Sequence, residues 1–147
     1  MSLKEKLAED LAAAIRARDE VSKRTLRMLK SELGKRELAL GRAPTEEEEL
    51  AVLLGAVKSR RDSVASYEEA GRLELAEDER AEIAVVERYL PPAMSEEEAR
   101  DAIAKLAAEL GLSEKREMGR LMGAVMEAHR GRIDGKLASR IARELLS

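Results

Sequence analysis

Apolar residues recur every three or four positions along most of this chain, which is the pattern of amphipathic helices. The first apolar stripe predicts a helix of about 15 residues and consists of Leu3, Leu7, Leu11 and Ile15. Asp19 is positioned to cap a second helix that extends to about residue 40. The expected buried side of that helix contains Val21, Met28, Leu29 and Leu33.

A long third helix is expected between Thr45 and Ala70. Thr45 with Glu48 forms a capping box at its start, and Gly71 follows its end. Its apolar stripe contains Leu50, Leu53, Leu54, Val57, Val64 and Tyr67. A shorter fourth helix is predicted from about residue 78 to residue 89.

The segment Leu90-Pro91-Pro92-Ala93 then interrupts the helical pattern, because proline is excluded from a helix interior. Ser95 with Glu98 forms a second capping box directly afterwards. We therefore place a domain boundary here, with an N-terminal helical domain over 1–92 and a C-terminal domain over 93–147. Three helices are expected in the second domain, at about 96–110, 114–129 and 136–146. The predicted fold is all-α, a multi-helix domain followed by a small three-helix domain.

Composition supports the all-α class and excludes several kinds of site. The chain has no cysteine, so disulfides, thiolate nucleophiles and cysteine-ligated metals are excluded. Aromatic residues make up 1%, with no Phe or Trp, which argues against a stacking platform for single-stranded nucleic acid. No apolar run approaches about 18 residues, and the N-terminal segment does not resemble a signal peptide. We expect a cytoplasmic protein with no membrane contact.

The net charge of −3 conceals an asymmetry along the chain. Residues 1–112 carry 19 basic and 25 acidic side chains, whereas residues 113–147 carry 8 basic and 5 acidic ones. A basic segment on an acidic body favours a polyanionic partner at one end. The chain also lacks Asn and Gln, the side chains best suited to reading adenine edges. A nucleic acid would therefore be recognised through its backbone and shape.

Two glycines, Gly119 and Gly123, lie inside the helix expected over 114–129. Glycine in a helix interior costs about 1 kcal/mol relative to alanine, so something must approach this helix closely. Two interpretations stay open, namely close packing against another helix and close approach of a ribose-phosphate backbone. The neighbouring methionines are expected to face the core and are Met118, Met122 and Met126.

Cations accompany these glycines. Lys136, Arg140 and Arg143 fall within about 60° of one another on the last helix, opposite an apolar stripe that is expected to pack inward. That stripe contains Leu137, Ile141 and Leu145. Arg130 and Arg132 precede the helix, and Arg120 faces away from the methionines, so the cations are expected to cluster at one end of the small domain. The alternatives are a solvated helix face and a phosphate-binding face. Asp134-Gly135 favours the second, because it exposes backbone N–H groups at a helix start.

No residues combine into a catalytic or metal site. His129 is the only histidine, and no histidine or cysteine accompanies it. The P-loop, nucleophile-elbow, HExxH and dinucleotide-binding motifs are absent from the sequence. We therefore expect no catalytic residues, no cofactor and no bound metal.

Ordered motifs extend over most of the chain: Arg27-Met28-Leu29-Lys30, Tyr67-Glu68-Glu69-Ala70-Gly71-Arg72, Tyr89-Leu90-Pro91, Met118-Gly119-x-x-Met122-Gly123 and Gly131-Arg132-x-Asp134-Gly135-Lys136. They resemble the YqeY family, which is similar to the C-terminal region of the GatB subunit of glutamine-dependent tRNA amidotransferase. In GatB this region ends in a three-helix tail that helps to hold tRNA. The resemblance implies a tRNA-facing surface, and with the cations described above it gives ten candidate nucleic-acid-binding residues: Gly119, Arg120, Gly123, Arg130, Gly131, Arg132, Gly135, Lys136, Arg140 and Arg143.

The leading hypothesis is a non-catalytic accessory protein of translation that binds or presents tRNA. One alternative is a component with carbon–nitrogen ligase activity that uses glutamine as amido-N-donor. Another is an adaptor that docks on an aminoacyl-tRNA synthetase or on amidotransferase subunits. The catalytic parts of the amidotransferase lie outside the region of resemblance, so we expect no ligase activity from this chain alone.

Overall fold

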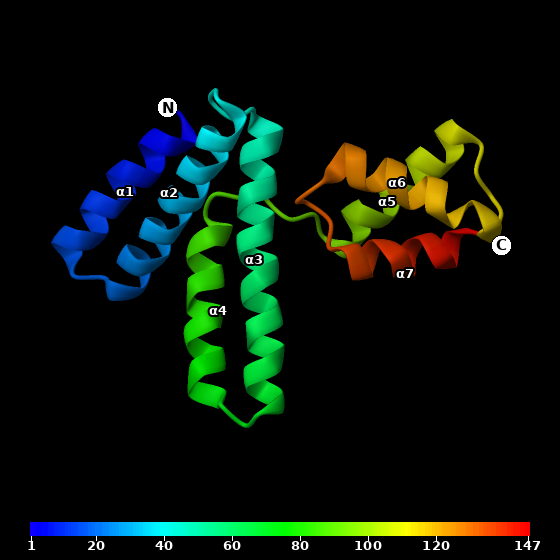
Figure 1. Cartoon of the computed structure of the whole chain (residues 1–147). Helices are drawn as coiled ribbons and strands as arrows, with labels where there is room; N and C mark the ends of the chain where they lie inside the picture. The colour runs from blue at the N-terminus through cyan, green and yellow to red at the C-terminus, as the bar shows by residue number, and fades with distance from the viewer. The chain divides into compact units, whose positions relative to one another are not determined.

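The computed structural model describes residues 1–147 and contains only helices and their connections, which confirms the all-α class (Figure 1). One compact unit, Met1–Leu90, contains α1 (Leu3–Ala17), α2 (Glu20–Leu40), α3 (Glu46–Glu69) and α4 (Leu73–Glu87). A second unit, Pro91–Ser147, contains α5 (Glu96–Leu110), the 3₁₀ turn η1 (Lys115–Glu117), α6 (Met118–His129) and α7 (Gly135–Leu145). None of these helices combines the length and apolarity needed to cross a lipid bilayer.

Three of the predicted helix starts are confirmed by their caps. The Asp19 carboxylate accepts a hydrogen bond from the Ser22 amide at 3.0 Å, where α2 begins. Thr45 forms the expected reciprocal capping box at the start of α3, and Ser95 forms the other at the start of α5. Each cap satisfies an amide that the first helical turn leaves without a partner, so these boundaries are fixed locally.

The start of α4 differs from the prediction. The helix begins at Leu73 instead of near residue 78, although Arg72 supplies no side-chain cap. Gly71 has a left-handed backbone with φ of 73°, and the Arg72 amide donates to the Tyr67 carbonyl at 2.7 Å. This tight reversal places the chain beside α3 immediately. Packing against α3 then supports the first turn of α4, which the sequence pattern alone does not reveal.

Each unit has its own hydrophobic core. The N-terminal core is built mainly from Leu7, Leu26, Leu29, Leu33, Leu53, Val57 and Val86. Ile15 belongs to the predicted apolar stripe and Met28 to the expected buried side of its helix, but they are 47% and 48% exposed. For Ile15 the reason is geometric, because residues spaced by four rotate about 40° per step around a helix. By Ile15 the stripe has turned away from the core, and Ala14 is buried instead.

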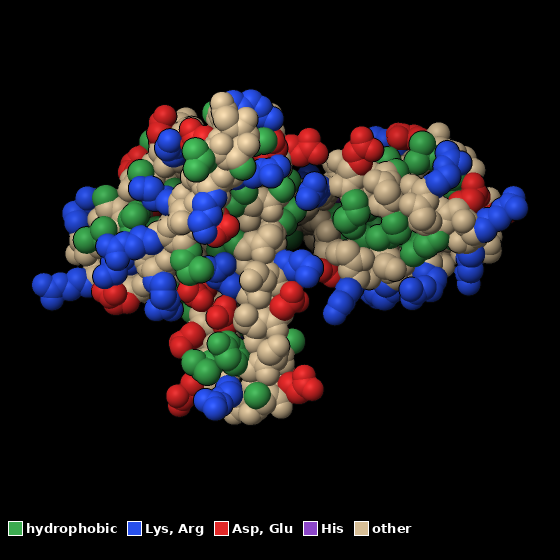
Figure 2. Space-filling model, viewed as in Figure 1, with side chains coloured by type: hydrophobic (Ala, Val, Ile, Leu, Met, Phe, Trp, Pro, Cys, Tyr) green, Lys and Arg blue, Asp and Glu red, His purple; other side chains and the backbone are tan.

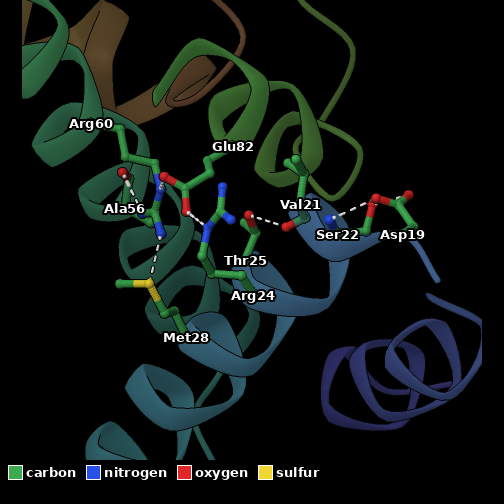
Figure 3. A network of polar contacts seen from close by, with 9 residues as sticks. All are labelled: Asp19, Val21, Ser22, Arg24, Thr25, Met28, Ala56, Arg60 and Glu82. Atoms are coloured by element: carbon green, nitrogen blue, oxygen red, sulfur yellow. Dashed lines mark hydrogen bonds and ion pairs between the residues drawn. The ribbon is translucent and has the colours of Figure 1, made fainter. Parts of the chain in front are cut away.

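A charge cluster with two buried members, Arg60 and Glu82, joins three helices of the N-terminal unit (Figure 3). The carboxylate of Glu82 on α4 accepts from Arg24 Nε on α2 at 3.1 Å. Its other oxygen lies 3.8 Å from Nε of Arg60 on α3. Arg60 Nη1 also donates to the Ala56 carbonyl at 3.0 Å. Because Glu82 and Arg60 are both buried, their charges depend on each other for compensation.

We expect Glu82→Ala to lower the free energy of unfolding of this unit by about 3 kcal/mol, because it leaves Arg60 buried without a counter-ion. Urea unfolding followed by tyrosine fluorescence measures this unit alone, since Tyr67 and Tyr89 both lie in it. Asp62→Ala is the control: it breaks an exposed ion pair with Lys58 and should change stability by less than about 1 kcal/mol. Equal losses in the two variants would contradict the role assigned to Glu82.

Glu48 at the start of α3 provides a pH test. Arg42 Nη1 donates to its carboxylate at 2.8 Å and the Thr45 amide donates at 3.0 Å, which lowers the pKa of Glu48 from 4.5 to about 2. A lowered pKa stabilises the fold above pH 4.5, and this stabilisation is lost as the pH falls toward 2. We expect Glu48→Gln to show a shallower loss of stability across that interval in urea unfolding at stepped pH. Parallel curves for the two proteins would show that Glu48 does not contribute.

Candidate nucleic-acid interface

The loop between α6 and α7 is fastened to the segment that precedes α5. Gly131 takes a left-handed backbone with φ of 82°, which turns the chain after α6. The Met94 amide donates to the Arg132 carbonyl at 2.8 Å, and Arg132 Nε donates to the Pro92 carbonyl at 3.1 Å. Asp134 then caps α7 by accepting from the Leu137 amide at 3.2 Å. Arg132 is therefore half-buried and helps to position the loop.

The last helix separates its apolar and cationic sides as predicted, with one exception. Its buried residues are Ala138, Ile141 and Ala142, while Lys136, Arg140 and Arg143 are exposed. Leu145 was predicted to pack inward but is 37% exposed, and Leu146 is buried in its place. The chain leaves the helix at Leu146, whose extended backbone turns that side chain into the core.

Two basic residues of this unit form ion pairs that join α5 to α7. Arg140 Nη2 lies 2.6 Å from Glu96 Oε1, and Arg100 pairs with Glu144. All four side chains are about half exposed, so each pair contributes less than about 1 kcal/mol. Among the candidate binding residues, the exposed cations that form no ion pair within the protein are Arg120, Arg130, Lys136 and Arg143. These four are available to an external anion.

Other acids of this unit are held by partners of their own. Backbone amides lower the pKa of Glu98, which caps α5, and of Glu117, which accepts from the Ser113 and Glu114 amides. The hydrogen bond from Arg100 likewise lowers the pKa of Glu144. These carboxylates stay ionised at neutral pH, and their hydrogen bonds lie within the C-terminal unit.

The cations are distributed along a helical hairpin instead of gathered at one end. A short loop joins α6 to α7, which run antiparallel (Figure 1). Arg120 and Arg143 therefore lie toward one end of the hairpin, and Arg130 and Lys136 toward the other. At 1.5 Å per residue the row is about 15 Å long. Figure 2 shows Lys and Arg side chains along the edge of this unit that α7 forms. Such a row suits an extended polyanion better than one small anion.

Packing within the protein does not require the glycines of α6. Gly119 and Gly123 are exposed, and a Cβ added at either would meet no atom within 4 Å. The same holds for Gly135 at the start of α7. Close packing against another helix of this unit is therefore excluded as their explanation, because α6 buries Leu121 and Val125 on a different side. What remains is an open strip of helix backbone.

Half-buried methionines border this strip and pack against the C-terminal core, as expected; they are Met118, Met122 and Met126. His129 lies at the end of α6 and is half-buried. No group of three His, Cys, Asp or Glu side chains is arranged to hold a metal ion. The surface around the strip consists of open backbone, thioethers and guanidinium or ammonium groups.

Similarity to known proteins extends over nearly the whole chain. A family model described as "Yqey-like protein" matches residues 4–146. The chain belongs to the YqeY family. It is also 29% identical over 145 residues to "Altered inheritance of mitochondria protein 41, mitochondrial" from Pyrenophora tritici-repentis (strain Pt-1C-BFP), in an alignment that covers 96% of this chain and 79% of that relative. The region matched to the YqeY family includes the α6 glycines, the loop and the α7 cations.

We expect Gly119→Ala and Gly123→Ala each to stabilise the C-terminal unit by about 0.5–1 kcal/mol, because the added methyl meets open space and improves helix propensity. Slower amide hydrogen exchange at buried Leu121 and Val125 measures this effect locally. Gly131→Ala is the contrasting variant and should destabilise, because φ of 82° strains any residue with a Cβ. Destabilisation by the α6 variants would contradict the open-strip description.

Proposed function

We propose that this protein is a non-catalytic accessory protein that binds tRNA through its C-terminal unit. It would present the tRNA to a partner in translation, such as an aminoacyl-tRNA synthetase or amidotransferase subunits. The observation that carries the proposal is the exposed glycine strip on α6, accompanied by cations that no acid of the protein neutralises.

The chemistry of this surface fits a structured RNA. With no side chain at Gly119 and Gly123, a ribose-phosphate backbone can come into van der Waals contact with the helix. The row of cations spans the distance between several successive phosphates, and each contact adds salt-dependent affinity. Exposed aromatics and amides, which would read unstacked bases, are missing from this unit. Recognition through shape and backbone follows, as in a folded region of tRNA.

Membership of the YqeY family supports the same choice of ligand, because the family resembles the tRNA-holding tail of GatB. The cytoplasmic location expected from the sequence is part of this proposal. The relative described above is named as mitochondrial, and a role beside tRNA is compatible with either compartment.

The test is binding of bulk tRNA to the full chain by fluorescence anisotropy across a salt series. With four unpaired cations, the slope of log affinity against log salt should be about −3. Lys136→Ala combined with Arg143→Ala should weaken binding about tenfold and make the slope shallower by about 2. Lys105→Ala is the matched control, an exposed α5 cation without an ion pair, and should bind like the wild type.

A steric variant separates backbone approach from charge. Gly123→Leu leaves the charge unchanged, so it should weaken tRNA binding without altering the salt slope. Salt-independent binding by the wild type, or an equal effect of Lys105→Ala and the α7 double variant, would overturn the proposal.

A further inference from the structure

A groove in the N-terminal unit is separate from the proposed nucleic-acid interface. It lies between the C-terminal half of α2 and the N-terminal half of α3 and has a volume of about 540 Å³. Its floor is made of small and apolar residues, including Leu29, Ala51, Val52 and Ala56. A second hollow of about 390 Å³ continues from it toward α4, since both are lined by Met28, Ser59 and Arg60.

Two residues keep the groove open and adaptable. Gly55 lies in the middle of α3, where a Cβ would meet no atom within 4 Å. Any larger side chain there would project into the groove that Gly55 lines. Met28 forms a flexible wall and is 48% exposed, although its position in the sequence predicted burial. A thioether side chain can change rotamer to fit an incoming group.

Arg60 retains donors that the protein leaves without good acceptors. Its side chain is only 9% exposed, yet Nε has no hydrogen bond, and Nη2 contacts only the Met28 sulfur at 3.5 Å (Figure 3). Nη1 makes its one hydrogen bond to oxygen, with Ala56. A guanidinium has five N–H donors and binds carboxylates strongly, whereas a thioether is a weak acceptor. Displacing Met28 would therefore give Nη2 a better partner.

The charges around the groove select an acidic occupant. Lys35, Arg36 and Arg60 line it against one acid, Glu32. Lys35 and Arg36 form long ion pairs. The distance is 3.5 Å from Lys35 to Glu32 and 3.8 Å from Arg36 to Glu48. Together with the 3.8 Å contact of Arg60 with Glu82, these long ion pairs leave the three lining cations only partly compensated. The excess of cations is confined to this groove, since acids outnumber cations in the lining of the hollow toward α4.

The fold already contains an example of such an occupant. Helix α4 packs against α2 and α3 at the other end of the same pair. It inserts aliphatic side chains, including Ile83 and Val86, and places the Glu82 carboxylate beside Arg24 and Arg60. The exposed groove offers a second helix the same combination of apolar floor and buried guanidinium.

We propose that the α2–α3 groove binds an amphipathic helix of a partner protein, whose contacting face carries aliphatic side chains and carboxylates, one of them paired with Arg60. The helix lies along the groove over Gly55, and Met28 moves aside to admit the carboxylate. The inference rests on the N-terminal unit alone and does not depend on tRNA binding.

The test uses the full chain labelled with ¹³C at its methionine methyl groups. The probe is a synthetic helical peptide of about 14 residues with a leucine face flanked by glutamates. We expect the Met28 resonance to shift saturably, while the resonances of Met118, Met122 and Met126 stay in place. A sister peptide with lysines in place of the glutamates should bind at least about tenfold more weakly.

Matched variants locate the binding site. Gly55→Leu fills the groove and should weaken peptide binding by at least about tenfold. Gly34→Leu is the control, because Gly34 is an exposed glycine of α2 with equally open surroundings and does not line the groove. It should bind like the wild type.

Four results would overturn the proposal. The first is no Met28 shift at peptide concentrations up to about 1 mM. The second is equal binding of the lysine peptide. A Met28 shift that depends on protein concentration without peptide would assign the groove to a second copy of the chain. A Met28 shift caused by tRNA would assign it to nucleic acid. Failure of tRNA to bind at all would contradict only the proposed function.

Discussion

Two consecutive prolines determine how this chain buries its apolar surface. Pro91 and Pro92 cannot continue a helix, and α4 ends at Glu87 in a series of turns that closes with the Leu90 amide. Residues up to Leu90 pack into one core, and residues from Met94 onward pack into another. Since each unit is stabilised by its own core, each can present its own surface chemistry. The N-terminal unit has a groove between helices, and the C-terminal unit has cations beside open helix backbone.

The N-terminal unit shows how a chain without Phe or Trp fixes the arrangement of its helices. Leucine and valine side chains supply much of the burial free energy, but aliphatic surfaces alone tolerate several packings. The contact of Glu82 with Arg24 and Arg60 is compatible with far fewer helix packings, because a buried carboxylate needs its partners at hydrogen-bond or ion-pair distance. Arg60 serves this contact with one side of its guanidinium. Nη2 of the same guanidinium contacts the Met28 sulfur, so the residue that helps to position α4 also lines the proposed docking groove.

The features that were predictable from the sequence are those fixed within a few residues. The caps of Asp19, Thr45 and Ser95 depend only on the neighbouring turn, and the structure places all three as expected. The start of α4 and the exposure of Met28 depend on packing between distant segments, which periodicity does not encode. The candidate interface also combines features fixed locally with features fixed by distant residues. The cationic side of α7 followed from helical geometry, but the pairing of Arg140 joins residues 44 positions apart and could not be anticipated.

Open space around a helical glycine does not by itself define a binding surface. Gly34, Gly55 and Gly123 all have room for a side chain, and each costs its helix about 1 kcal/mol relative to alanine. What distinguishes the last two is their neighbours: Met28 and a buried guanidinium beside Gly55, and half-buried methionines with unpaired cations near Gly123. In both places a missing side chain leaves room for a partner's backbone, a thioether can change rotamer beside it, and a cation can attract an acidic group. Surfaces of this kind favour a class of partner over one sequence, which is the selectivity that the proposed recognition of tRNA through backbone and shape requires.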